Sequence, residues 1–151
     1  MFLVNCNAKA LPTQKFLGWT LHQRTLTAEN LLVRHWSCDW ICSLCRQAFE
    51  DTDHLFCHCT FIKQTWQRVA AAKGFTGNFD TTSAKQWMHS LASSCSKEEP
   101  RLRVAALIKT WWHTWLQRNA KIFCQQEPNC QQTVFYVLED INEQEWAFKP
   151  P

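Results

Sequence analysis

Residues 38–59 contain seven side chains that could bind a metal ion. Four cysteines and two histidines lie in CSLCRQAFEDTDHLFCHC, residues 42–59, and Cys38 precedes them. Thiolate and imidazole donors without a fixed carboxylate favour Zn²⁺ over Mg²⁺, Ca²⁺ or Mn²⁺. A structural zinc site takes four such ligands in a tetrahedron. We therefore predict one bound Zn²⁺, held by four of the seven candidates.

Cys42 and Cys45 form a C-x2-C pair, a spacing that lets both thiolates bind one ion across a tight turn. Together with Cys38 they also give C-x3-C-x2-C, the spacing of three cysteines that hold an iron–sulfur cluster in radical enzymes using S-adenosylmethionine. Those enzymes need a large α/β barrel with glycine-rich cofactor contacts. This sequence favours zinc, because it has three glycines in 151 residues and no strand pattern.

The last ligand stays open on spacing alone. His54 is expected in a short helix capped by Thr52 or Asp51, where Cys57 and His58 would share its face and Cys59 would not. A continuous helix favours His58, whereas a helix that frays before Thr60 lets Cys59 turn back to the ion. Three alternatives therefore complete the site: Cys57, His58 and Cys59.

The zinc is expected to be structural, and the protein is not expected to be an enzyme. A catalytic zinc ion keeps an open position beside three protein ligands. Here four good ligands are at hand, and no H-x-E precedes the cysteine pair as it does in zinc deaminases. Chelation should loosen residues 38–60 most, because this segment has few apolar side chains of its own to bury.

The composition indicates a globular and mainly helical chain. Apolar residues make up 46% and charged residues 19% of 151 residues, a length that suits one domain with a core. Nine tryptophans and ten phenylalanines suggest a core of large flat side chains. Three glycines and five prolines are few for a β-sandwich.

The N-terminal segment MFLVNCNAKA lacks the basic region and the apolar length of a secretory signal. No run of eighteen apolar residues could span a membrane. Nine cysteines, an odd number, indicate reduced thiols with a metal rather than a disulfide scaffold. We therefore expect an intracellular protein.

The net charge of +3 is unevenly distributed. Residues 61–127 carry ten basic and four acidic side chains, whereas residues 128–151 carry one and four. A basic middle segment could face nucleic acid. The alternative is that these dispersed side chains are ordinary solvated faces of helices.

Helical spacing of apolar residues recurs along the chain and predicts an all-α fold, with residues 38–59 as a zinc-tied loop-helix insert. Residues expected at helix ends are Pro12, Thr27, Thr60, Gly74, Asn129 and Gln132. Four regions follow: an N-terminal extension at 1–11, a zinc-binding domain at 12–73 with its ligands in 42–59, a loop at 74–82, and a C-terminal helical region at 83–147 packed on the domain.

The longest predicted helix runs from about Pro100 to Cys124. Its apolar half holds Val104, Ile108, Trp111, Trp112, Trp115 and Ile122, and its polar half holds Arg103, Thr110, Thr114, Gln117 and Lys121. Asn119 falls within the apolar half. We expect it to be buried and to hydrogen-bond a main-chain group, because an unpaired buried amide costs about 1–3 kcal/mol. Arg118 lies nearer the edge and should reach solvent or a carboxylate.

The segments FLGWTLHQRTLTAENLLVRHW and CSLCRQAFEDTDHLFCHCTFIKQTW resemble the zinc-binding domain that follows the reverse transcriptase in plant non-LTR retroelements. WLQRNAKIF resembles the tail found downstream. The family pattern has a Leu-Thr-Ala-(Asp/Glu)-x-Leu segment, a C-x2-C pair, a Glu-Thr-x-x-His-Leu stretch, a final Cys and a Trp seven residues later. The matching residues here are Leu26 to Leu31, Cys42, Cys45, Asp51 to Leu55, Cys59 and Trp66.

The resemblance implies a ligand set of Cys42, Cys45, His54 and Cys59, with Cys38, Cys57 and His58 as bystanders. Two departures stand out. Asp51 replaces the family's Glu, and the Trp- and Tyr-containing segment with which the family domain usually starts is missing. The polymerase is not expected in this sequence, because its Tyr-x-Asp-Asp turn is absent and the one tyrosine, Tyr136, lies in YVLED.

The function implied by the resemblance is that of a non-catalytic zinc module from a retroelement reverse transcriptase polyprotein. It would assist the binding of RNA or DNA and contact other retroelement proteins, without a membrane or a small-molecule substrate as partner. The alternative is a protein-interaction module, or a retroelement relic without affinity for nucleic acid.

Overall fold

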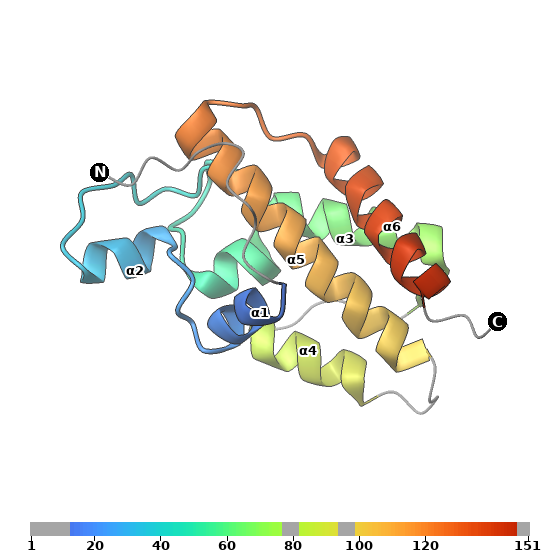
Figure 1. Ribbon diagram of the computed structural model, residues 1–151. Helices are drawn as coiled ribbons and strands as arrows, with labels where there is room; N and C mark the ends of the chain where they lie inside the picture. The colour runs from blue at the N-terminus through green and yellow to red at the C-terminus, as the bar shows by residue number, and fades with distance from the viewer. Residues whose placement is uncertain (1–12, 77–81, 94–98, 148–151) are drawn as a thin grey trace.

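The computed structural model describes residues 13–76, 82–93 and 99–147, which contain six α-helices, one π-helical turn and the loops between them (Figure 1). In chain order the elements are α1 (Thr13–Leu21), α2 (Ala28–Val33), the π-turn η1 (His54–His58), α3 (Thr60–Lys73), α4 (Ala84–Ala92), α5 (Glu99–Cys124) and α6 (Cys130–Ala147). These residues contain no strand, and Ile41 and Phe49 form an isolated antiparallel bridge. The all-α prediction is confirmed.

Several predicted helix ends are confirmed. Gly74 adopts a left-handed backbone, with φ of 70°, directly after α3. The Asn129 side chain accepts a hydrogen bond from Gln132 N at the start of α6, at 2.9 Å. The prediction for Thr60 is wrong by one residue, because α3 begins at Thr60 and Cys59 takes the N-cap position.

Helix α5 is the central helix of the fold. It contacts α1, α3, α4 and α6, and Figure 1 shows it running across the molecule in front of α3. The predicted division of this helix into an apolar and a polar half is therefore wrong in part. Thr110 and Thr114 of the polar half are buried, and Ile122 of the apolar half is exposed. The buried Thr110 hydroxyl donates to Ala106 O at 2.8 Å. A helix enclosed by four others has no single solvent side.

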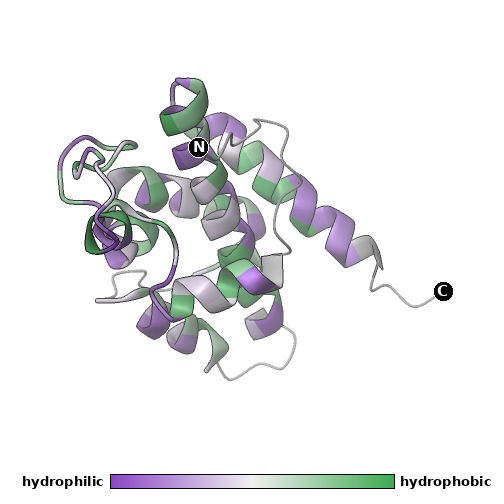
Figure 2. Ribbon diagram, turned by 60° about the vertical axis from the view of Figure 1, so that its left-hand side comes forward, coloured by the Kyte–Doolittle hydropathy of each residue, from purple (hydrophilic) through white to green (hydrophobic). Residues whose placement is uncertain are grey.

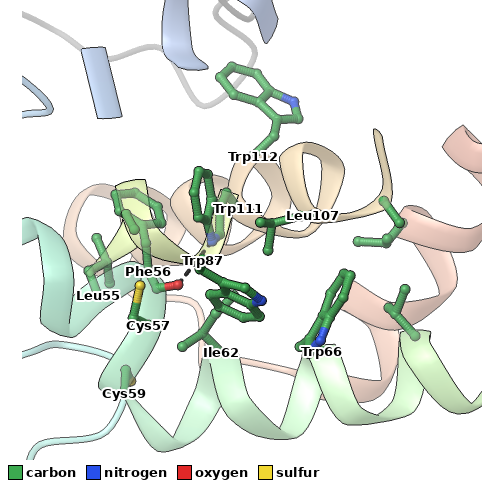
Figure 3. Close-up of a cluster of buried hydrophobic side chains, with 14 of the residues drawn as sticks. Leu55, Phe56, Cys57, Cys59, Ile62, Trp66, Trp87, Leu107, Trp111 and Trp112 are labelled. Atoms are coloured by element: carbon green, nitrogen blue, oxygen red, sulfur yellow. Dashed lines mark hydrogen bonds between the residues drawn. The ribbon is translucent and has the colours of Figure 1, made fainter. Parts of the chain in front are cut away.

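Aromatic side chains fill the core, as the composition suggests (Figure 3). Trp66 and Trp111 both meet Trp87 edge to face, with ring centroids 5.4 and 6.2 Å apart. These three rings come from α3, α5 and α4. One core therefore joins the predicted zinc-binding domain to the helical region that follows it.

The outer helices have a polar side and an apolar side. Figure 2 shows hydrophilic and hydrophobic positions together on α6, where Val137 and Ile141 are buried while Glu139 and Glu143 are exposed. Among the described helices, none is both long and apolar enough to cross a bilayer.

Candidate metal centre

Four side chains converge at one point in the structure: Cys42, Cys45, His54 and Cys59. Their donor atoms all lie within 4.8 Å of one another. The Sγ atoms of Cys42 and Cys59 are 3.9 Å apart, and Cys45 Sγ lies 3.3 Å from His54 Nε2. Ligands at tetrahedral angles around zinc are roughly 3.3–3.8 Å apart. The arrangement therefore fits one Zn²⁺, and it brings together the set that the resemblance implied.

The C-x2-C pair lies in a tight turn that the main chain closes. The bridge between Ile41 and Phe49 flanks this turn, and Arg46 N donates to Cys42 O at 2.9 Å. Arg46 itself adopts a left-handed backbone, with φ of 58°. This conformation turns the chain back toward Phe49 and leaves the sulfurs of Cys42 and Cys45 within one cluster.

The π-turn η1 explains how Cys59 reaches the site. Its main-chain hydrogen bond runs from Cys59 N to His54 O at 2.7 Å, so it spans five residues rather than the four of an α-helix. The wider turn places Cys59 on the same side of the turn as His54. At Cys59 the backbone becomes extended, with ψ of 136°, and the π-turn ends. Sequence reasoning assumed an α-helix, in which Cys59 would not share a face with His54.

The other candidate ligands are engaged elsewhere. Cys57 is buried in the hydrophobic core (Figure 3). His58 Nε2 lies 3.2 Å from the carbonyl of Thr82, to which it can donate. The Cys38 thiol lies 3.8 Å from the carbonyl of Ala28. None of the three belongs to the convergent group.

Two carboxylates hold η1 in place. Asp51 Oδ1 accepts from His54 N at 2.6 Å, so Asp51 rather than Thr52 caps the turn. Asp53 Oδ1 accepts from Ala84 N, at the start of α4, at 2.9 Å. The histidine at the site is thus fixed by its own acidic stretch and, through Asp53, by α4.

Among the cysteines that the structure describes, Cys124 departs from the sequence expectation. Cys124 at the end of α5 is disulfide-bonded, so the expectation of reduced thiols is wrong for this residue. Cys42, Cys45 and Cys59 form no disulfide, so their sulfurs are available to bind zinc as thiolates.

The thiols of Cys42 and Cys59 are buried side by side, with their sulfurs 3.9 Å apart. The hydrogen bond between the two thiols lowers the pKa of Cys42 to about 4 although burial opposes the charge. The same contact, together with burial, raises the pKa of Cys59. A divalent cation opposes this second shift, because its charge favours the thiolate form of both cysteines.

Glu50 was not predicted from the sequence. It joins the loop that carries Cys42 and Cys45, the metal-binding loop, to helices α2 and α5. Its Oε1 accepts from the Arg118 guanidinium at 2.7 and 3.1 Å and from Ala28 N at 3.0 Å. Its carbonyl accepts from Glu29 N at 3.1 Å. Glu50 therefore caps α2, whereas the side chain of Thr27 at the N-cap position makes no capping hydrogen bond.

The prediction for Asn119 is wrong. Asn119 is half-buried, and its side-chain oxygen accepts from Arg118 Nη1 at 3.2 Å instead of pairing with a main-chain group. Arg118 is buried instead, and it reaches the carboxylate of Glu50. Of the two predicted alternatives, solvent or a carboxylate, the second is confirmed. The Arg118 guanidinium also lies 5.0 Å over the ring of Trp115. The family's Glu lies four residues before its His, a position that Glu50 and not Asp51 occupies here, so the expectation that Asp51 replaces this Glu is wrong. Glu50 is also the buried acid.

A match to a known family agrees with this geometry. The family model described as zinc-binding in reverse transcriptase matches residues 4–66, a segment that contains all four convergent donors. It begins upstream of residue 12, where sequence reasoning placed the start of the domain. No curated protein and no solved structure matches the chain. Residues 4–66 are therefore similar to the zinc-binding domain of reverse transcriptase.

Proposed function

We propose that the chain is a non-catalytic zinc module in which Cys42, Cys45, His54 and Cys59 ligate one structural Zn²⁺, and that the folded module assists the binding of single-stranded RNA or DNA. The convergence of four donors inside the family segment carries the zinc part of this proposal. The nucleic-acid part is supported by the family's association with reverse transcriptase and by the charges described below.

A closed ligand shell supports a structural rather than a catalytic ion. Three thiolates and one imidazole complete a tetrahedron, so no position remains for a water molecule or a substrate. Cys42 and Cys59 are also buried, which keeps solvent from two of the four donors. The ion would therefore contribute folding free energy to the loop that it closes.

The charge available to a nucleic acid is smaller than the count for residues 61–127 suggests. Several basic side chains in that segment pair with carboxylates of the protein: Lys73, Lys109, Arg118 and Lys121. Lys63 and Arg68 lie on the exposed face of α3. Arg34 and Arg46, outside the basic segment, are exposed beside the metal-binding loop.

The test is metal analysis of purified protein together with a fluorescence-anisotropy titration of labelled single-stranded RNA and DNA. We expect one zinc per chain and an affinity that falls as salt rises, because phosphate contacts release counterions. An affinity weaker than about millimolar at low salt, or one insensitive to salt, would remove the nucleic-acid part. The zinc count decides the metal part independently.

A further inference from the structure

We propose that single-stranded nucleic acid binds to an aromatic loop face formed by Trp36, Trp40, Phe49, Arg34 and Arg46. Bases would stack on the two indole rings, and the guanidinium groups would contact phosphates. This inference rests on the proposed function and names the surface that carries it. The surface belongs to the end of α2 and to the loop that closes the metal site, at the opposite end of the molecule from the C-terminal end of α6 (Figure 1).

The tryptophans of this face are exposed although the chain has an aromatic core. Trp36 is 56% and Trp40 is 55% exposed, whereas Trp66 and Trp111 are at most 1% exposed. Val33, directly before Arg34, is also exposed. Three large apolar side chains, Val33, Trp36 and Trp40, are thus exposed within eight consecutive residues, and exposed apolar patches often mark binding sites.

The main chain holds these rings in fixed positions. Phe49 pairs with Ile41 in the isolated bridge, and Trp40 directly precedes Ile41. The rings of Trp40 and Phe49 lie side by side, with centroids 6.4 Å apart and ring planes tilted by 34°. Glu50 N donates to Trp40 O at 3.0 Å, beside the same bridge. A ring that is already positioned loses little freedom when a base stacks on it, so preorganisation favours binding.

The main chain of Trp36 is also held by a hydrogen bond. The main-chain N–H of Trp36 donates to Leu31 O at 3.0 Å. His35, directly before it, turns the chain with a left-handed φ of 60°. Trp36 and Trp40 are four residues apart, so their Cα atoms are separated by at most about 14 Å. One short strand of unpaired nucleotides can therefore contact both indoles.

The charges on this face suit a polyanion. Arg34, His35 and Arg46 are exposed, and residues 33–49 contain one carboxylate, that of Asp39. Arg46 Nη1 donates to Asp39 Oδ2 at 2.9 Å, which offsets this negative charge. The Arg46 side chain remains 63% exposed, so its other N–H groups can reach a phosphate.

Cations next to flat rings favour a nucleic acid over an apolar protein partner. Aromatic side chains accept any base face, and arginines follow the backbone, so such a surface binds single strands with little sequence preference. Paired bases are stacked on each other and offer no free face to an indole. We therefore expect single strands to bind more tightly than a duplex of the same length.

The experiment uses fluorescence anisotropy with a labelled single-stranded oligouridylate and the full chain. Trp36→Ala and Trp40→Ala should each weaken binding by about fivefold or more, and Trp36→Phe should retain most of the affinity because it keeps a ring. Arg34→Ala should reduce the slope of log K against log salt by about 0.7. The matched controls, Phe135→Ala and Tyr136→Ala, remove exposed aromatic rings of α6 and should leave the affinity unchanged.

Each other outcome has a distinct meaning, provided that zinc content and circular dichroism show the variants to be folded. If the wild type binds RNA but only Lys63→Ala and Arg68→Ala weaken it, the aromatic loop face is wrong and the proposed function stands. If the wild type binds neither RNA nor DNA, both proposals fail. If the tryptophan variants lose self-association in sedimentation while their RNA affinity is unchanged, the face joins copies of the chain and this inference is overturned.

Discussion

Arg118 on α5 donates two hydrogen bonds to Oε1 of Glu50, and the two side chains are only 3% and 2% exposed. The same oxygen accepts from Ala28 N at the start of α2. Glu50 follows the bridged turn of Cys42 and Cys45 and precedes the η1 turn of His54. One buried carboxylate thus links the metal-binding loop to a neighbouring helix and to the central helix of the fold.

Arg118→Met should destabilise the protein by about 3–5 kcal/mol, because it leaves the Glu50 carboxylate buried without its cationic partner. The midpoint and slope of urea unfolding, measured on zinc-loaded protein, would show the change. The matched control is Arg46→Ala, which removes an arginine from an exposed pair with Asp39. Exposed pairs are worth about 0–1 kcal/mol, so this variant should unfold close to the wild type.

The double variant Glu50→Gln with Arg118→Met should recover part of the loss, because it leaves no unpaired charge in the core. Recovery has an upper limit, since the neutral amide that replaces the Glu50 carboxylate keeps only part of the capping of α2. An Arg118→Met variant as stable as the Arg46→Ala control would show that the buried pair contributes nothing to the fold.

Much of the fold could be predicted from local signals in the sequence. Gly74 stops α3 because it takes a left-handed backbone at no steric cost, and Asn129 starts α6 because its side chain accepts from the amide three residues on. C-x2-C spacing likewise predicts a pair of sulfurs on one turn. These features depend on neighbouring residues alone, so a single sequence contains them.

Features that depend on distant residues could not be predicted in the same way. The spacing from His54 to Cys59 suits a π-turn, but periodicity counted on an α-helix places Cys59 on another face. The burial of Thr110 and Thr114 follows from the neighbours of α5, not from its own residues. Glu50 and Arg118 are 68 residues apart, and a charged pair is not expected in a core until both partners are seen.

Removal of zinc should loosen the metal-binding loop and η1 more than α5 and α6. The loop depends on single hydrogen bonds, such as Arg46 N to Cys42 O and Cys59 N to His54 O, that the metal would hold in register. Hydrogen exchange with and without a strong chelator should show the largest loss of protection at these amides. Equal protection in both samples, with metal loss confirmed, would contradict a structural ion.

Cys59→Ser and Cys57→Ser should differ although the two residues are neighbours. Cys59 belongs to the convergent group, so its replacement should release zinc or weaken its binding strongly. Cys57 lies in the hydrophobic core, so its replacement should keep one zinc per chain while costing about 1–3 kcal/mol for a buried hydroxyl. Cobalt substitution with visible absorption would count the thiolate ligands. Loss of metal from the Cys57 variant alone would reverse the assignment.

Zinc affinity should rise with pH. The pKa of Cys59 is raised by its hydrogen bond to Cys42, whose own pKa is lowered to about 4, so near neutral pH the metal-free pair retains one proton between the two sulfurs. Zinc binds the thiolate and must release this proton, so affinity should rise by at least about tenfold per pH unit near neutrality and fall as the solution is acidified. Competition with a calibrated chelator across this range would measure it, and a pH-independent affinity would contradict the shared proton.

Trp111→Phe should weaken both the fold and the metal site, because Trp111 Nε1 donates to the carbonyl of Phe56 inside η1 at 2.9 Å (Figure 3). The variant removes this buried donor and strands the carbonyl, which costs about 1–3 kcal/mol beyond the lost ring volume. Since η1 carries His54 and precedes Cys59, a less constrained turn should also lower zinc affinity. Trp87→Phe is the matched control: it removes the same ring volume from a buried tryptophan whose Nε1 has no acceptor among the described residues. Urea unfolding and chelator competition on the two variants therefore isolate the hydrogen bond. Equal losses in the two variants would show that the indole of Trp111 acts through packing alone.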